Sequence, residues 1–162
     1  MPTRQHGPYL ITNFLAIGPC RGAGGPSVDS LARAGFRHII DLNADRSEKS
    51  LSRLAEVDYH PIETYDEHSV ELWIRHIQEA VSIIEQAARH NQKVYLHCTY
   101  GFGRSPTIAM AYLVSKNRSI QEAIRHVKKR GRLIWNEGNP VQKYGRVLQA
   151  YEDSISGRPS RR

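Results

Sequence analysis

The sequence contains few cysteines, no long apolar run and no residue spacing typical of a metal site. Two cysteines, Cys20 and Cys98, are too few for a disulfide-stabilised scaffold and favour a reducing compartment. No apolar run approaches the length of about 20 residues that a membrane-spanning helix needs, and residues 1–8 lack the apolar core of a signal peptide. The eight histidines do not combine with the cysteines in a zinc-binding pattern such as Cys-x-x-Cys. We therefore expect a cytoplasmic domain with no membrane span and no bound metal.

The length and the net charge of the chain constrain its domain count and its ligands. A chain of 162 residues, of which 40% are hydrophobic, is long enough to bury the core of one domain. The formal net charge of +7 favours anionic ligands, because a basic surface concentrates them. We expect one domain over residues 1–156 and a basic, disordered tail over residues 157–162, for which a docking role is the alternative.

Segments with strand and helix patterns alternate along the chain. Short apolar or alternating segments predict strands at residues 9–11, 14–18, 37–42, 58–62 and 93–96. Apolar periodicity and capping residues predict helices over residues 28–34, 70–90, 106–114, 120–129 and 141–154, with helical character in residues 43–55 as well. This alternation is typical of an α/β fold, a single domain with a central, mostly parallel, twisted sheet of about five strands flanked by helices on both faces. Ligands bind beyond the carboxyl ends of such strands.

The loop from His97 to Ser105 joins the last predicted strand to an apolar helix. Such a loop binds anions, because it directs unpaired backbone N–H groups at one point in front of the positive end of a helix dipole. Cys98 begins the loop and Arg104 ends it, with five residues between them. This environment favours the thiolate, which is the nucleophilic form of cysteine. The planar guanidinium of Arg104 can bind two oxygens of a tetrahedral oxyanion.

The residues between Cys98 and Arg104 form the predicted substrate-binding surface. Gly101 and Gly103 allow close backbone approach and positive φ where a side chain would block the anion. Ser105 places a hydroxyl near Cys98, where it can stabilise the thiolate as a leaving group. We assign substrate binding to Arg104 and to the loop interior, which consists of Thr99, Tyr100, Gly101, Phe102 and Gly103.

The order His97-Cys98, five residues, Arg104, Ser105 resembles the signature of the cysteine-dependent protein phosphatases. Residues 93–142 are most similar to the small dual-specificity phosphatases of the VH1-related kind. The resemblance implies the fold of that family, phosphorylated proteins as partners, and a two-step reaction through a phosphocysteine. The alternative is a buried, inert cysteine beside a surface arginine.

A second segment adds to the resemblance. Asn136 and Gln142 lie in a segment that resembles the Asn-x-Gly-x-x-x-Gln of the same family, although Asn139 stands where an aromatic residue is usual. The resemblance implies supporting roles for Asn136 and Gln142. His97 is expected to point away from the phosphate and to orient the loop by hydrogen bonding.

The first chemical step needs a group that protonates the departing oxygen. A carboxylic acid on a loop able to close over the site can do this, and residues 63–69 form an acidic loop before a long helix. We assign the role to Asp66, which stands about where the resembled phosphatases carry their acid. Glu63 and Glu67 are alternatives, and the acidic cluster can instead cap the following helix. No metal or other cofactor is expected, because Arg104 and backbone N–H groups supply the charge stabilisation.

Three hypotheses remain for the function, and the first two differ in the substrate. The loop interior lacks the lysines that phosphoinositide-directed relatives often carry, so the resemblance favours phosphotyrosine, with phosphoserine and phosphothreonine also accessible. The pattern Cys-Thr-x-Gly-Phe-x-Arg also resembles the RNA 5′-triphosphatases of the same superfamily, and the positive charge suits RNA, so nucleic acid is the second hypothesis. The third is a catalytically idle phospho-binding module, against which the presence of both Cys98 and Asp66 argues.

Cys20 has two interpretations. It is either a small, buried core residue or a partner that forms a reversible disulfide with Cys98 under oxidation.

Overall fold

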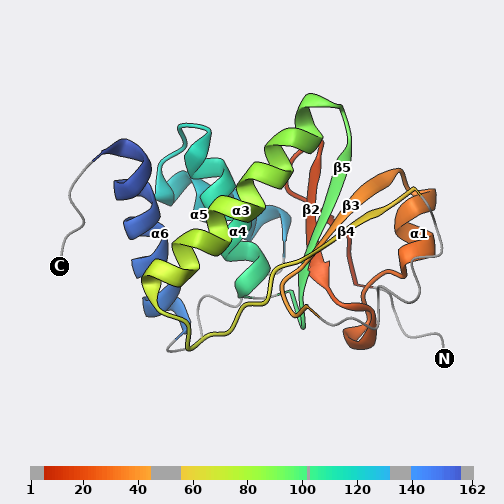
Figure 1. The fold of residues 1–162 in the computed structure, drawn as a ribbon, viewed down its shortest axis with the longest axis horizontal. Helices are drawn as coiled ribbons and strands as arrows, with labels where there is room; N and C mark the ends of the chain where they lie inside the picture. Colours follow the sequence, from red (N-terminus) through yellow and green to blue (C-terminus); the bar gives the residue numbers. More distant parts are fainter. Residues whose placement is uncertain (1–5, 45–55, 102, 132–139, 158–162) are drawn as a thin grey trace.

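The computed structural model describes residues 6–44, 56–101, 103–131 and 140–157, with side chains from residue 144 onward in the last range. Five strands of the described residues form one sheet in the order β1, β2, β5, β3, β4 (Figure 1). β1 runs antiparallel to β2, and the other neighbouring strands are parallel. This confirms the mostly parallel sheet that the sequence predicts. The strand bounds are β1 (Tyr9–Leu10), β2 (Leu15–Pro19), β3 (Phe36–Asp41), β4 (Asp58–Pro61) and β5 (Lys93–Cys98).

β5 lies in the middle of the sheet, between β2 and β3. It is buried from Val94 to Cys98, as expected of a parallel strand that is covered on both faces. The register pairs Pro19 of β2 with Cys98 and pairs Asp41 of β3 with His97. The carboxyl ends of these three neighbouring strands therefore lie side by side. The loop that follows β5 has the end of β2 on one side and the end of β3 on the other.

Serine caps mark the start of three helices. Ser27, Ser69 and Ser119 each accept a hydrogen bond from a backbone N–H of the first turn. α4 begins at Arg104 rather than at Pro106, so this arginine belongs to the first turn of the helix. The larger part of the predicted helical segment 43–55 lies outside the described residues. The bounds are η1 (Arg21–Ala23), α1 (Val28–Arg33), α3 (Val70–Arg89), α4 (Arg104–Ser115), α5 (Ile120–Arg130) and α6 (Pro140–Ser156).

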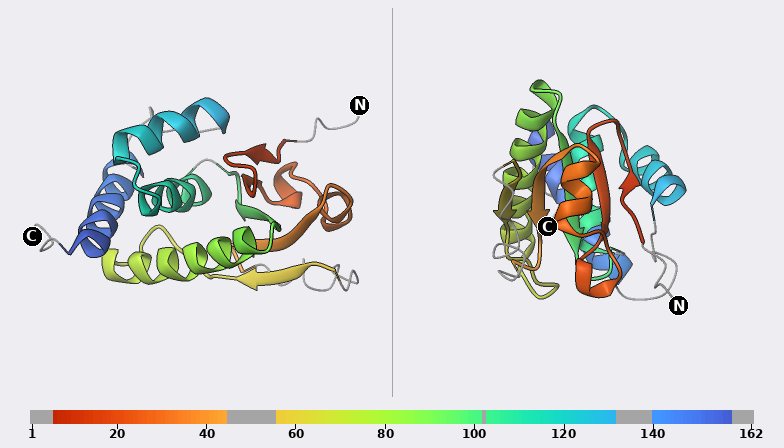
Figure 2. Two further views of the ribbon diagram at one scale, coloured as in Figure 1. Left: turned by 90° about the horizontal axis from the view of Figure 1, so that it is seen from above. Right: turned by 90° about the vertical axis from the view of Figure 1, so that its right-hand side faces the viewer.

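Alternate strand residues pack into two cores on opposite faces of the sheet. The larger core contains Leu15, Ile40 and Leu96 together with side chains of α3, α4, α5 and α6. The smaller core contains Ile39 and Tyr95 together with side chains of α1. Figure 1 shows α1 on one side of the sheet and the other four α-helices on the opposite side, and Figure 2 gives two further views. The prediction of helices on both faces is confirmed, with most of the apolar core on one of them. None of the helices within the described ranges is long and apolar enough to cross a membrane.

Two pairs of histidines are joined by hydrogen bonds between their ring nitrogens. His38 Nδ1 lies 3.1 Å from His60 Nε2, and His68 Nδ1 lies 3.0 Å from His76 Nε2. Each bond needs one ring nitrogen without a proton, so a pair in which both rings are charged cannot form it. Burial lowers the pKa of His60 and of His76 from 6.5, and the charge of the paired histidine lowers each pKa further.

We expect the free energy of unfolding to decrease as the pH falls from about 7.5 to about 5.5. The unfolded chain, whose histidines titrate at 6.5, takes up protons before the folded His60 and His76 do. Stability from these two histidines is therefore present above pH 6.5 and is lost below it. Urea unfolding at a series of pH values measures the effect. The double variant His60→Gln, His76→Gln should show a flatter pH dependence, and an equally steep one would contradict the role of the two pairs.

Candidate active site

Cys98 is the last residue of β5, and the chain turns through residues 99–103 into α4. The cysteine is buried, with only 3% of its surface exposed. The backbone N–H of Gly101 donates a hydrogen bond to Cys98 Sγ over 3.3 Å, and Ser105 Oγ lies 3.4 Å from the same sulfur. Hydrogen-bond donors of this kind stabilise a thiolate. The structure therefore brings Cys98 and Ser105 together.

The turn after Cys98 depends on two glycines that lie against each other. Gly101 has a φ of +76°, and a Cβ on it would lie 2.6 Å from the carbonyl carbon of Gly18. A Cβ on Gly18 would in turn lie 2.4 Å from the hydroxyl of Tyr95. The N–H of Cys20 donates to the carbonyl of Thr99 over 3.0 Å, so the segment that follows β2 is hydrogen-bonded to the loop. The backbone conformation that directs the Gly101 N–H at the sulfur thus requires glycine at this position.

Arg104 is held by uncharged acceptors. Its Nη1 donates to the carbonyl of Thr64 over 2.8 Å and approaches the carbonyl of Leu42 at 3.5 Å. Its Nη2 donates to Asn43 Oδ1 over 2.7 Å and to Thr99 Oγ1 over 3.1 Å. These bonds orient the guanidinium without adding a negative charge beside it. The positive charge of Arg104 is therefore directed at the loop without being neutralised by these partners.

A buried carboxylate fixes the strand ends beside the loop. Asp41, the last residue of β3, is fully buried and accepts hydrogen bonds from the Tyr59 hydroxyl over 2.5 Å and from the N–H of Asn43 over 2.9 Å. His97 is also buried, and its Nδ1 lies 3.8 Å from Asp41 Oδ1 and 3.3 Å from the carbonyl oxygen of Cys98. The contacts of Asp41 thus set the position of Asn43, which binds Arg104.

Asp66 lies in the loop between β4 and α3 and is exposed. Its Oδ1 accepts a hydrogen bond from the hydroxyl of Tyr144 in α6. Burial raises the pKa of Tyr144, and the hydrogen bond to Asp66 raises it further. The positive charge of Arg104 lowers the pKa of this hydroxyl, and a negative charge on Cys98 raises it. The pair of Asp66 and Tyr144 is therefore close enough to the loop after β5 to share its electrostatic field.

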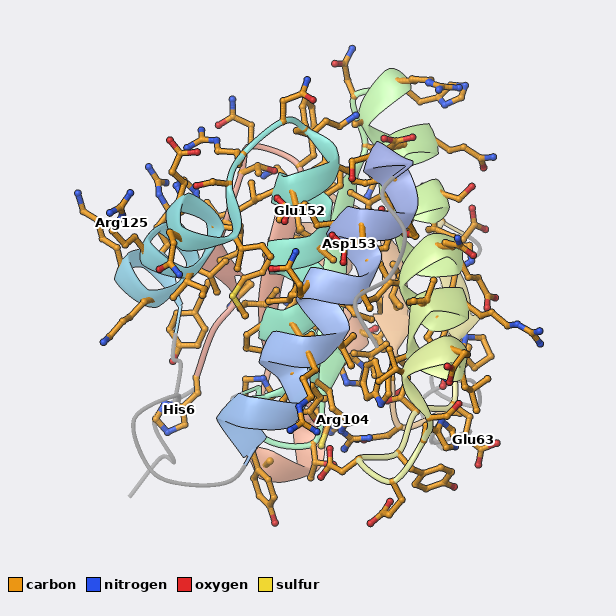
Figure 3. All side chains as sticks on the ribbon, turned by 90° about the vertical axis from the view of Figure 1, so that its left-hand side faces the viewer. His6, Glu63, Arg104, Arg125, Glu152 and Asp153 are labelled. Atoms are coloured by element: carbon orange, nitrogen blue, oxygen red, sulfur yellow. The ribbon has the colours of Figure 1, made fainter. Side chains whose placement is uncertain are left out.

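The two alternative acids lie in the same exposed loop. Glu63 Oε1 accepts a hydrogen bond from the Tyr65 hydroxyl over 2.6 Å. In Figure 3, Glu63 and Arg104 lie at the same end of the molecule, the end at which α6 begins. Ser69 is the residue that caps α3, through the N–H of Leu72, so capping of this helix does not depend on the carboxylates.

Some predicted site residues lie outside the described residues, and others are exposed to solvent. Phe102 and Asn136 are outside the described residues, and Gln142 lies in α6 with its side chain outside them. Tyr100 is 65% exposed. Cys20 is only partly buried, which corrects its interpretation as a buried core residue, and it forms no disulfide with Cys98 in this structure.

Three residues of the site were not assigned from the sequence. Asn43 follows β3 at the carboxyl edge of the sheet, so the rule that ligands bind at this edge could have identified it. Thr64 contributes mainly a backbone carbonyl, which leaves no signal in the residue type. Tyr144 lies on the apolar stripe of its helix and is 3% exposed, so the pattern assigns it to the core.

The family model for the dual specificity phosphatase catalytic domain matches residues 23–153. The chain belongs to this family. Cys98, Arg104 and Ser105 all lie within the matched residues. The membership confirms the family that the sequence motifs indicate.

Similar proteins support the membership. Dual specificity protein phosphatase 5 of Rattus norvegicus is 31% identical over 152 residues, which cover 93% of this chain and 37% of the relative. Dual specificity protein phosphatase 1 of Mus musculus is 28% identical over 163 residues, which cover 96% of this chain and 42% of the relative. The chain thus spans less than half the length of these relatives.

Solved structures show the same fold. The crystal structure of human DUSP28 matches with a TM-score of 0.73 at 20% identity, covering 92% of this chain and 98% of that one. The crystal structure of Tk-PTP in the active form matches with a TM-score of 0.65 at 26% identity, covering 94% of this chain and 97% of that one. The chain has the fold of a dual specificity phosphatase domain.

We expect Asn43→Ala to weaken the inhibition of this domain by inorganic phosphate about tenfold. Asn43 Oδ1 orients Arg104 Nη2, and a hydrogen bond to a charged group contributes about 1.5–3 kcal/mol. The inhibition constant, measured with an aryl phosphate as substrate, tests this. Asn13→Ala, at an exposed turn of the β1–β2 hairpin, is the control. An unchanged constant for Asn43→Ala would mean that the backbone acceptors alone orient the guanidinium.

Proposed function

We propose that this domain is an active cysteine-dependent phosphatase that hydrolyses phosphate monoesters on proteins through a phosphocysteine intermediate. The supporting observation is the environment of Cys98 Sγ, which accepts an N–H from Gly101 in a loop that leads directly into Arg104. Membership of the dual specificity phosphatase family supports the same activity.

In the first step, the thiolate of Cys98 attacks phosphorus in line with the leaving oxygen. The N–H groups of the loop and the guanidinium of Arg104 bind the equatorial oxygens, where negative charge is concentrated. The S–P bond forms, the P–O bond to the leaving group breaks, and Asp66 donates its proton to the departing oxygen. These groups provide the charge stabilisation and the proton, so the step requires no metal.

In the second step, water attacks the phosphocysteine. Asp66, now ionised, accepts a proton from the water as the new P–O bond forms. The S–P bond breaks, and the hydroxyl of Ser105, 3.4 Å from Sγ, stabilises the departing thiolate. Inorganic phosphate is released, and both Cys98 and Asp66 return to their starting protonation states.

The preferred substrate in this proposal is phosphotyrosine, with phosphoserine and phosphothreonine as further substrates and phosphorylated proteins as partners. Thr99, Tyr100, Gly101 and Gly103 add no cation to the loop, so a multiply charged inositol head group gains little there. Tyr100 is 65% exposed and offers an aromatic surface beside the anion-binding loop. An aromatic ring attached to the phosphate can pack on such a surface.

The proposal places the catalytic domain within residues 1–156, with residues 157–162 as a basic tail. Residues 23–153, which the family model matches, lie inside these bounds. We assign the domain to the cytoplasm, because a sequence with only two cysteines favours a reducing compartment.

We expect Cys98→Ser to abolish turnover of p-nitrophenyl phosphate, assayed in the presence of a chelator, because the nucleophile is lost. The folded variant should still bind a phosphotyrosine peptide, since Arg104 and the loop N–H groups remain. Wild-type protein that binds the peptide without turning it over would indicate a phospho-binding module. A higher kcat/KM for release of the γ-phosphate from 5′-triphosphate RNA than for phosphotyrosine peptides would overturn the substrate class.

We expect Asp66→Asn to lower kcat/KM for phenyl phosphate by about 10²–10⁴, the range for loss of a general acid. The loss should be much smaller for p-nitrophenyl phosphate, whose leaving group needs less protonation. Glu67→Gln, the neighbouring carboxylate, is the matched control. A leaving-group-dependent loss in Glu67→Gln or Glu63→Gln, with none in Asp66→Asn, would move the role to that glutamate.

A further inference from the structure

Tyr144 links two segments that lie far apart in the sequence. It belongs to α6, and its hydroxyl donates a hydrogen bond to Oδ1 of Asp66 in the loop between β4 and α3. Tyr144 is 3% exposed, whereas Asp66 is exposed. A buried side chain therefore holds the carboxylate of a surface loop.

The ring of Tyr144 is itself fixed by the core. It makes an edge-to-face contact with the fully buried Trp73 of α3, with ring centroids 5.5 Å apart and an interplanar angle of 85°. Trp73 Nε1 also donates to the carbonyl oxygen of Tyr65 over 3.1 Å. Two aromatic side chains in contact with each other thus bind two consecutive residues of the loop, Tyr65 and Asp66.

The same ring faces the loop that carries the nucleophile. A Cβ placed on Gly103 would lie 3.5 Å from Tyr144 Cε2, which is van der Waals distance. The end of the Tyr144 ring that carries the hydroxyl therefore contacts Asp66 and also lies close to Gly103, the residue before α4. Because burial and the bond to Asp66 raise the pKa of Tyr144, its hydroxyl keeps its proton at neutral pH and remains a donor.

We propose that Tyr144 is a positioning residue that holds the carboxyl group of Asp66 at the phosphate loop. This inference rests on the proposed role of Asp66 as the acid and base. Oδ1 accepts the hydrogen bond of Tyr144 whether or not Asp66 is protonated, so the catalytic proton is carried on Oδ2. That proton moves from Oδ2 to the leaving oxygen in the first step, and a proton from water replaces it on Oδ2 in the second. Tyr144 exchanges no proton and returns unchanged.

Tyr144→Phe tests the proposal, because it removes the hydroxyl and keeps the ring that contacts Trp73. We expect kcat/KM for phenyl phosphate to fall about tenfold to a hundredfold, since a poorly placed catalytic group loses this much. The value for p-nitrophenyl phosphate should fall less than about threefold, because its leaving group depends little on the acid. The inhibition constant of inorganic phosphate should not change, since Arg104 and the loop keep their contacts.

Tyr151→Phe is the matched control. Tyr151 lies two turns further along the same face of α6, is equally buried, and has its hydroxyl near Ser115 and Glu85 rather than near Asp66. A merely structural effect of losing a buried hydroxyl should appear in both variants and for both substrates. Equal losses in the two variants, or a Tyr144→Phe loss that is the same for both leaving groups, would overturn the positioning role.

A double-mutant cycle with Asp66→Asn separates this inference from the proposed function. If Tyr144 acts through Asp66, Tyr144→Phe should have less than about a twofold effect in the Asp66→Asn background. A full additional loss in that background would contradict the inference and leave the role of Asp66 intact. If Asp66→Asn itself shows no leaving-group dependence, the assignment of the acid fails and the inference fails with it.

Discussion

The contact between Gly101 and Gly18 is the constraint on which the site depends. The backbone of the loop after β5 lies so close to the end of β2 that a Cβ on Gly101 would meet the Gly18 carbonyl carbon at 2.6 Å. This close approach, together with the positive φ of Gly101, directs an N–H at the sulfur of Cys98. The sheet makes the approach available, because parallel pairing places the ends of β2 and β5 side by side. The surroundings of Cys98 Sγ are thus set by strand register.

Residues that follow the carboxyl ends of the strands hold Arg104 through uncharged acceptors. Its bonds go to the carbonyl of Thr64, the amide oxygen of Asn43 and the hydroxyl of Thr99. A carboxylate at any of these places would hold the guanidinium as firmly but would also neutralise part of its charge. The carboxylate of Asp41, at the end of β3, instead accepts bonds from Tyr59 and from the backbone of Asn43. The carboxylate of Asp41 therefore fixes the strand ends, while uncharged acceptors orient the guanidinium of Arg104.

The sequence predicts those parts of the molecule that local patterns determine. The apolar run of β5, the serine caps at Ser27 and Ser119, and the loop from Cys98 to Arg104 are each encoded by neighbouring residues. Asn43 follows the carboxyl end of β3, so the rule for parallel sheets points to its position, but its bond to Arg104 appears only in the folded chain. Thr64 escapes prediction because it acts mainly through a backbone carbonyl that meets Arg104 only after the strands have paired. Tyr144 also escapes prediction as a site residue. Its place on the helix stripe predicts burial, but only the tertiary fold shows that its hydroxyl reaches Asp66.

The contact of Tyr144 with Asp66 joins core packing to chemistry. A surface loop that carries an acid has few contacts of its own and would lose conformational entropy each time its carboxyl group came into position. Here Trp73 and Tyr144 belong to the larger core and also bind the loop at Tyr65 and Asp66. Conformational entropy of the loop is therefore lost when the core folds, rather than each time the carboxyl group comes into position. The hydroxyl of Tyr144 would be costly to bury without a partner, and Asp66 supplies that partner. The same hydrogen bond therefore satisfies a buried polar group and pre-organises the carboxylate that we propose as the acid.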